Sequence, residues 1–167
     1  MKNLLQFAFI LLIVFTATDL FSQNVMINVI TQNSGEVKKG QVIFFEVTIY
    51  NTSPTKTLAM YKIRPQIDFP SALVSIPEKG HVLPKGWTIT SIKKGAVTLS
   101  NGTDIIPENS TRTILIAMKA ESIGGPTSIN GNIYFSNGIA PGNLSGISTK
   151  EDNLADNSSS STVKVFQ

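Results

Sequence analysis

The chain of 167 residues contains no cysteine. Disulfides, thiolate metal ligands and lipid attachment through cysteine are therefore excluded, whatever the redox state of the compartment in which it works. Its stability has to come from a packed core. A chain of this length is sufficient for one such domain and too short for two comfortable ones.

Histidine is almost as scarce, since His81 is the only one. Zinc would lack its usual ligands, and a Ser-His-Asp triad has no Gly-x-Ser-x-Gly segment to supply the nucleophile. Because glycine and valine flank His81, we expect it in a solvent-facing turn. Carboxylates remain available as a pair for glycoside hydrolysis: Asp68, Glu78, Asp104, Glu108 and Glu121. No motif selects among them, so we assign no catalytic residue, metal or cofactor and predict that the chain is not an enzyme.

Charge of either sign is sparse, and the formal net charge is only +3. The basic residues are scattered, and their two adjacent pairs, Lys38-Lys39 and Lys93-Lys94, each precede a glycine. Such placement is typical of hairpin turns and strand edges, where lysines oppose pairing with other chains. A nucleic-acid interface would require a dense basic face with aromatic platforms. Nucleic acid is therefore not an expected partner.

One long apolar run is present, at residues 4–15, between Lys2 and a short polar stretch that ends at Gln23. This order of a charged start, an apolar centre and a polar exit predicts a secretory signal peptide over residues 1–23. The run is too short to span a bilayer stably. We therefore expect a mature domain over residues 24–167, without a membrane span, that is secreted or held at the cell surface, with the periplasm as the other compartment open to it.

Helical periodicity is absent after residue 23, and short alternating segments separated by Asn, Gly, Ser, Pro and Lys predict strands instead. Alternation is clearest at Phe45, Val47 and Ile49, and Ile129, Ile133 and Phe135 share a face with Gly131. So many short strands predict an all-β antiparallel sandwich of about 7–9 strands. The expected strands cover residues 25–31, 42–50, 61–68, 72–76, 88–92, 96–100, 111–119, 128–135 and 161–166.

Two segments are candidates for contacts with a partner. Pro65 lies inside the strand predicted at residues 61–68, and a proline favours an edge strand or a bulge because it cannot donate a ladder hydrogen bond. Residues 137–157 are rich in Gly, Asn, Ser and Asp and are expected to form a mobile loop. An exposed edge can receive a partner strand, and loops at the ends of a sandwich can vary freely.

Two further patterns carry a family resemblance. Gly40 leads a strand through residues 46–49 into the turn Tyr50-Asn51-Thr52-Ser53-Pro54, and residues 152–158 read Asp-Asn-Leu-Ala-Asp-Asn-Ser before the last strand. These segments resemble the conserved-repeat domain of unknown function of bacterial cell-surface proteins, with Ser53 and Asp156 in place of a glycine and an asparagine. The resemblance implies an immunoglobulin-like sandwich with a structural or interaction role.

The acidic residues of that last loop have two interpretations. Their side chains can accept hydrogen bonds from loop amides, which is ordinary turn chemistry. Glu151, Asp152 and Asp156 can also supply part of the six to eight oxygens that calcium requires. Because no spaced glycine and bidentate glutamate accompany them, they are only weak calcium candidates.

Aromatic residues supply the last candidate surface. Trp87 follows a Pro-Lys-Gly turn and is expected in the core, where most of the strand aromatics must pack. Phe44, Tyr50 and Tyr134 have the outward parity in their strands, and aromatics on one solvated face are typical of sugar-binding modules. We therefore predict a non-catalytic structural or adhesion-type module at the bacterial cell surface, with an unknown protein or glycan as partner. The alternative is a carbohydrate-binding or calcium-dependent adhesion module.

Overall fold

The computed structural model describes residues 24–136 and 156–167. The predicted signal peptide, residues 1–23, lies outside the described residues, and so does most of the loop predicted at residues 137–157. The described part contains one short 3-10 turn, η2 (Gln32–Gly35), and ten strands: β1 (Val25–Thr31), β2 (Glu36–Lys38), β3 (Val42–Asn51), β4 (Ile63–Asp68), β5 (Val74–Ser75), β6 (Thr88–Lys93), β7 (Ala96–Ser100), β8 (Ser110–Ala120), β9 (Gly124–Phe135) and β10 (Ser158–Phe166).

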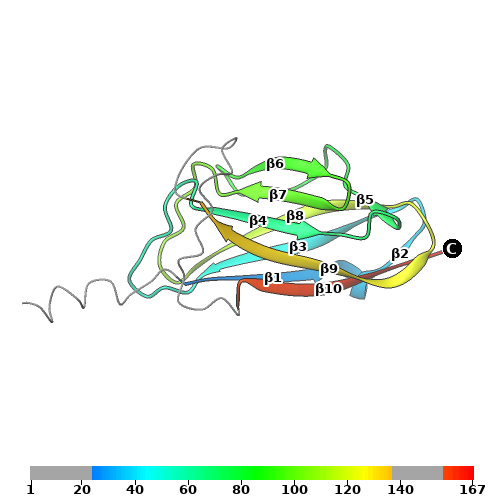
Figure 1. Ribbon diagram of the computed structural model, residues 1–167, viewed down its shortest axis with the longest axis horizontal. Helices are drawn as coiled ribbons and strands as arrows, with labels where there is room; N and C mark the ends of the chain where they lie inside the picture. The colour runs from blue at the N-terminus through cyan, green and yellow to red at the C-terminus, as the bar shows by residue number, and fades with distance from the viewer. Residues whose placement is uncertain (1–23, 137–155) are drawn as a thin grey trace, which may run out of the picture.

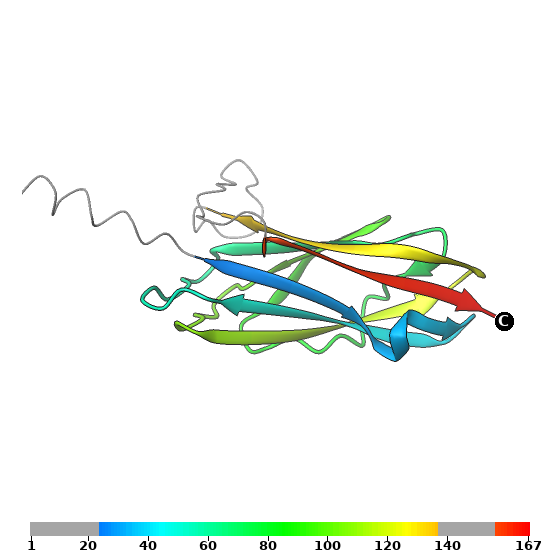
Figure 2. The same ribbon diagram turned by 90° about the horizontal axis from the view of Figure 1, so that it is seen from below.

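The strands form two sheets that pack face to face. The four-stranded sheet has the order β1-β3-β8-β5, and the six-stranded sheet has the order β2-β10-β9-β4-β7-β6. Figure 1 shows the strands running along the long axis of the molecule, and Figure 2, turned by 90°, shows the two layers. The predicted all-β sandwich is therefore confirmed. Its pairings are antiparallel except for β10 with β2, which is parallel.

All nine predicted strands are present, and the tenth, β2, was missed. It has only three residues and follows η2, in which Asn33 and Ser34 adopt positive φ angles of 50° and 54°. Three residues are too few to show alternation, so the sequence carries no periodic signal for this strand. Its single buried residue, Val37, is 5% exposed and belongs to the core.

Alternation places the core as predicted. In β3, Phe45, Val47 and Ile49 are completely buried, and in β9, Ile129 is completely buried and Phe135 is 2% exposed. The two inner faces meet between the sheets, which is how a sandwich buries one face of each strand. Burial of these side chains supplies the main stabilisation that a chain without disulfides requires.

Gly131 shows how closely the sheets approach. It lies on the inner face of β9, and a Cβ atom built there would be only 2.4 Å from Cγ2 of Val29 in β1 and 3.1 Å from Cδ1 of Ile27. Only a residue without a side chain fits at this distance. The glycine that shares a face with apolar residues in β9 is therefore explained by packing against β1.

The prediction that residues 61–68 form an edge strand is wrong. β4 lies inside the six-stranded sheet, between β9 and β7. The backbone nitrogens of Ile63 and Phe69 point toward β7, where they donate to Asn101 Oδ1 and to the carbonyl of Gly95. Pro65 has the same parity, so its nitrogen also faces β7, where the ladder covers only residues 66–68 of β4. The proline therefore costs β4 nothing in its ladder with β9.

Two buried asparagines hold the loops at one end of the sandwich. Asn51, which is 1% exposed, donates from Nδ2 to the carbonyls of Lys56, Ile106 and Pro107 at 2.9–3.0 Å. Its Oδ1 accepts the amide of Ser53 at 3.3 Å, as expected for a turn asparagine. Asn101 is completely buried and donates from Nδ2 to two further loop carbonyls at 2.8 Å.

Candidate functional site

The three aromatics predicted to form an interaction surface lie on two different sheets. Phe44 and Tyr50 belong to β3 in the four-stranded sheet, whereas Tyr134 belongs to β9 in the six-stranded sheet. All three are half-buried and alternate with core residues, so they occupy the outer faces. Because the outer faces of a sandwich point in opposite directions, Tyr134 does not share a face with Phe44 and Tyr50. The three predicted aromatics therefore do not form a single interaction surface.

Of the calcium candidates, only Asp156 is among the described residues, where it lies just before β10. Glu151 and Asp152 lie outside them, so the calcium prediction stays a prediction. Within residues 24–136 and 156–167, no group of three or more His, Asp or Glu side chains is arranged to hold a metal ion.

Asp104, one of the five carboxylates that were open to a catalytic role, is held by two neighbouring side chains. Asp104 Oδ2 accepts a hydrogen bond from Trp87 Nε1 at 2.7 Å and another from Arg112 Nε at 2.7 Å, and Arg112 Nη2 donates to Asp104 Oδ1 at 3.1 Å. Trp87 is 5% exposed, so its predicted core position is confirmed. This cluster joins the turn before β6 to β8. The Asp104 carboxylate therefore holds structural elements together through hydrogen bonds.

Two surface glutamates are held by neighbouring hydroxyls. The Thr57 hydroxyl donates to Glu108 at 2.6 Å, and this hydrogen bond lowers the pKa of that carboxyl below its ordinary value. The Ser75 hydroxyl donates to Glu121 at 2.7 Å and, together with Lys119, lowers the pKa of Glu121. Both carboxylates are thus favoured in the charged form, which is the opposite of what a general acid at neutral pH requires.

The prediction that His81 lies in a solvent-facing turn is wrong, because its side chain is half-buried and bonds to β8. Its Nδ1 accepts a hydrogen bond from the backbone amide of Ala117 at 3.1 Å. In the neutral ring the other nitrogen, Nε2, then carries the proton, and it donates to the carbonyl of Pro77 at 2.8 Å. The adjacent Val82 exchanges two backbone hydrogen bonds with Leu115 at 2.8 and 2.9 Å. The segment before β6 therefore covers the edge of β8 that short β5 leaves unpaired.

The other edge of the four-stranded sheet is covered by serine hydroxyls. Ser159 and Ser161 of β10 accept the backbone amides of Val29 and Thr31 in β1, both at 3.0 Å. Ser161 also shares a hydrogen bond of 2.8 Å with the Thr31 hydroxyl. Two edge amides of β1 are thereby satisfied from the other sheet, which removes donors that a foreign strand would use.

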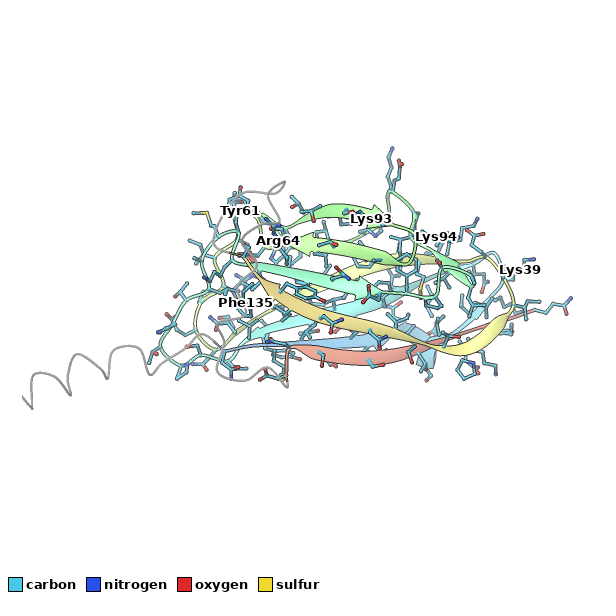
Figure 3. All side chains as sticks on the ribbon, in the orientation of Figure 1. Lys39, Tyr61, Arg64, Lys93, Lys94 and Phe135 are labelled. Atoms are coloured by element: carbon cyan, nitrogen blue, oxygen red, sulfur yellow. The ribbon has the colours of Figure 1, made fainter. Side chains whose placement is uncertain are left out.

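Each lysine pair ends an edge strand and enters a turn: Lys38 and Lys93 are the last residues of β2 and β6, and Lys39 and Lys94 follow in turns. Only the second pair lies at a hairpin, because β6 pairs with β7 whereas β2 and β3 belong to different sheets. Figure 3 shows Lys39, Lys93 and Lys94 toward one end of the molecule and Tyr61, Arg64 and Phe135 toward the other. No helix among the described residues is long and apolar enough to cross a membrane.

A hollow of about 540 Å³ opens on the outer face of the six-stranded sheet. We call it the polar trough, and it is lined by Asp68, Asn130, Asn132, Ser158, Ser159 and Ser160. The Ser159 hydroxyl bonds to β1, so the amides, hydroxyls and carboxylate that face the hollow belong to the other five residues. These residues come from three neighbouring strands, β4, β9 and β10. The trough is the candidate functional site, because its polar groups converge at a concave surface.

The strand registers place the trough residues in two rows, each of which runs across β4, β9 and β10. Asn130 lies opposite Asp68 on β4 and opposite Ser160 on β10. One step along β9, Asn132 lies opposite Gln66 and Ser158. Residues two apart on a strand share a face, so both rows point outward together.

The site was not predicted from the sequence, although the alternation of polar and apolar residues in β9 indicated part of it. Asn130 and Asn132 alternate with buried Ile129 and Ile133, so their outward orientation could have been predicted. Their neighbours could not, because Asp68 and Ser160 are far away in the chain and only the register brings them to Asn130.

Comparison with known proteins bears on the fold. No protein-family model matches the chain, and no curated protein matches it. A solved cohesin module from a Clostridium perfringens family 33 glycoside hydrolase is 11% identical, with a TM-score of 0.54 over 85% of this chain and 98% of that one. The chain has an immunoglobulin-like fold. A Pyrococcus furiosus CARDB domain matches with 10% identity and a TM-score of 0.49 over 87% of this chain and 90% of that one. A Nocardia farcinica protein described as having an immunoglobulin-like fold matches with 11% identity and a TM-score of 0.44 over 82% of this chain and 98% of that one.

Proposed function

We propose that this immunoglobulin-like domain is an exported, non-catalytic interaction module of the bacterial cell surface. In this proposal residues 1–23 are a signal peptide that is removed, and residues 24–167 form the working domain. The observation that carries the proposal is the polar trough, a concave set of side chains with hydrogen-bonding capacity on the outer face of the six-stranded sheet.

The chemistry of the described residues supports binding over catalysis. Asp104 is engaged by Trp87 and Arg112, and both ring nitrogens of His81 have backbone partners. A general acid or base must be free to exchange a proton with a substrate. These groups are instead used to fasten loops and strands.

The fold supports the same function. The cohesin module with the same fold is a part of a glycoside hydrolase in Clostridium perfringens. By analogy, this sandwich would present a rigid surface to a partner. Since Ser159 and Ser161 satisfy amides of β1 and His81 satisfies one of β8, contacts through side chains on a sheet face are favoured over strand addition at these edges.

Fractionation and protease treatment of intact cells test the proposal. We expect the chain in the medium, or on cells that lose it when an external protease is added. The matched control deletes residues 4–15, which removes the predicted export signal and should retain the chain in the cytoplasm. A wild-type chain that stays in the cytoplasm would overturn the whole proposal, and protection in the periplasm would overturn its surface location.

A further inference from the structure

We propose that the polar trough binds a neutral, hydroxyl-rich oligosaccharide. This inference rests on the proposed function only in taking the chain to be a binding module, and it concerns the ligand class. It does not depend on where the protein is located. Binding in solution can therefore succeed or fail independently of export.

The dimensions suit a short stretch of a sugar chain. Neighbouring strands lie about 4.8 Å apart, so the trough spans about 9–10 Å from β4 across β9 to β10. Its volume of about 540 Å³ falls in the range of small-molecule sites. Asn130, Ser158 and Ser160 are exposed, so a ligand reaches the lining without any rearrangement of the sandwich.

The hydrogen-bonding groups are ready for a ligand. Within the described residues, no hydrogen bond engages the side chains of Asn130 and Asn132, and Asp68 accepts only one, from Gln66 Nε2 at 2.9 Å. Each amide offers donors and an acceptor side by side. Adjacent hydroxyls of a sugar ring offer the same combination, so one asparagine can bond two of them.

The charge of the trough favours a neutral ligand. Its lining contains no lysine or arginine, and Asp68 is its single charged group. Arg64 belongs to the neighbouring row on β4 but is only 5% exposed. An anionic polymer would thus meet a carboxylate without an accessible cation, and a calcium ion would find only one negatively charged ligand in the lining.

Tyr134 extends the trough with an aromatic ring. It follows Asn132 by two residues on the same face of β9 and pairs with Arg64. A half-buried tyrosine presents an apolar ring and a polar hydroxyl. The C–H face of a sugar ring can contact such a ring while its hydroxyls bond to Asn132 and Ser158. Of the three aromatics predicted from sequence, Tyr134 is therefore the one placed to act.

An NMR titration of the full chain tests this proposal. The probes are cellotetraose, maltotetraose and chitotetraose, each added up to about 10 mM, because weak sites have dissociation constants of about 1 mM. We expect at least one probe to shift the backbone amides of β4, β9 and β10 around Asp68, Asn130 and Ser160. Polygalacturonate oligomers, which are anionic, should bind more weakly than that probe.

Two variants and one control locate the site. Asn132→Ala and Asp68→Ala should each weaken binding about tenfold, the usual effect of losing a hydrogen bond to a ligand. Thr113→Ala alters an exposed residue of β8, on the other sheet, and should change the affinity less than about twofold. All three positions are at the surface, and the amide spectrum of each variant verifies that it is folded.

Three results would overturn the proposal. The first is the absence of any shift with all three neutral probes. The second is a set of shifts centred on Phe44 and Tyr50, which would place the ligand on the other sheet. The third is shifts in the trough that depend on protein concentration without sugar, because they would assign the surface to a second copy of the chain.

Discussion

Replacement of Asp104 by alanine should be among the most destabilising changes at a polar position of this domain. Its carboxylate accepts Trp87 Nε1 and Arg112 Nε, each at 2.7 Å, and the side chains of Asp104 and Arg112 are only 12% and 25% exposed. A hydrogen bond to a charged group contributes about 1.5–3 kcal/mol. The partly exposed ion pair adds about 1 kcal/mol or less. Because the two interactions share one carboxylate, we expect a total loss of about 2–4 kcal/mol.

Urea unfolding followed by the fluorescence of Trp87, the single tryptophan, measures this loss. Asp104→Asn keeps an acceptor for the indole but removes the charge, so it should lose about half as much as Asp104→Ala. Glu36→Ala is the matched control, since it breaks an exposed pair with Lys164 at 3.1 Å and should cost about 0–1 kcal/mol. The slope of the transition should stay the same in all three variants.

A double-mutant cycle isolates the indole contact. Trp87→Phe removes the N–H and keeps a ring, so it is combined with Asp104→Ala and followed by circular dichroism. We expect a coupling of at least about 1 kcal/mol between the two positions. A cost of Asp104→Ala no larger than that of Glu36→Ala, or a coupling close to zero, would refute the role assigned to this carboxylate.

Three other changes have defined outcomes. His81→Ala should destabilise the domain by about 1–3 kcal/mol, because it leaves the Ala117 amide without its acceptor. Ser159→Ala should accelerate hydrogen exchange at the Val29 amide, which loses its acceptor. The lowered pKa of Glu121 means that this group stabilises the fold above pH 4.5 and loses its contribution as the pH falls through the folded-state pKa, and an NMR titration of its carboxyl carbon should show a midpoint below 4.5.

Each of these outcomes has a control and a contrary result. Exchange at the Ala117 amide should accelerate in His81→Ala, and unchanged exchange would contradict the bond. Ser160→Ala changes the neighbouring outward-facing serine and should leave exchange at β1 unaltered, so an equal effect of Ser160→Ala would count against the Ser159 contact. Ser75→Ala should raise the midpoint of Glu121, since the Ser75 hydroxyl is the largest cause of its lowered pKa. A midpoint that does not move would contradict this cause.

Local patterns predicted the strands well, because side-chain alternation is a property of the strand itself. Phe45, Val47 and Ile49 are core residues in the structure as in the prediction, and the turn before Trp87 leads into a buried indole. The antiparallel sandwich followed from the number and spacing of such segments, and its immunoglobulin-like character was implied by the family resemblance.

Properties that depend on pairing between distant strands were beyond the sequence. Pro65 is compatible with an interior strand only because its nitrogen faces β7 where the ladder is short. Phe44 and Tyr134 each point outward from their own strand, but the two strands belong to different sheets. His81 shows no sign of a partner in the sequence, since Ala117 lies 36 positions away. The polar trough was missed for the same reason.

The absence of cysteine from the chain makes one measurement particularly direct. Ser160→Cys places a single thiol in the trough, and Thr113→Cys places one on an exposed site of the other sheet. Each variant is treated with a membrane-impermeant maleimide on intact cells and as purified protein. If the chain is a surface module that binds through the trough, both purified variants will react, whereas on cells only Thr113→Cys will react fully. Equal labelling of both variants on cells would contradict binding through the trough, and no labelling of either would contradict the surface location.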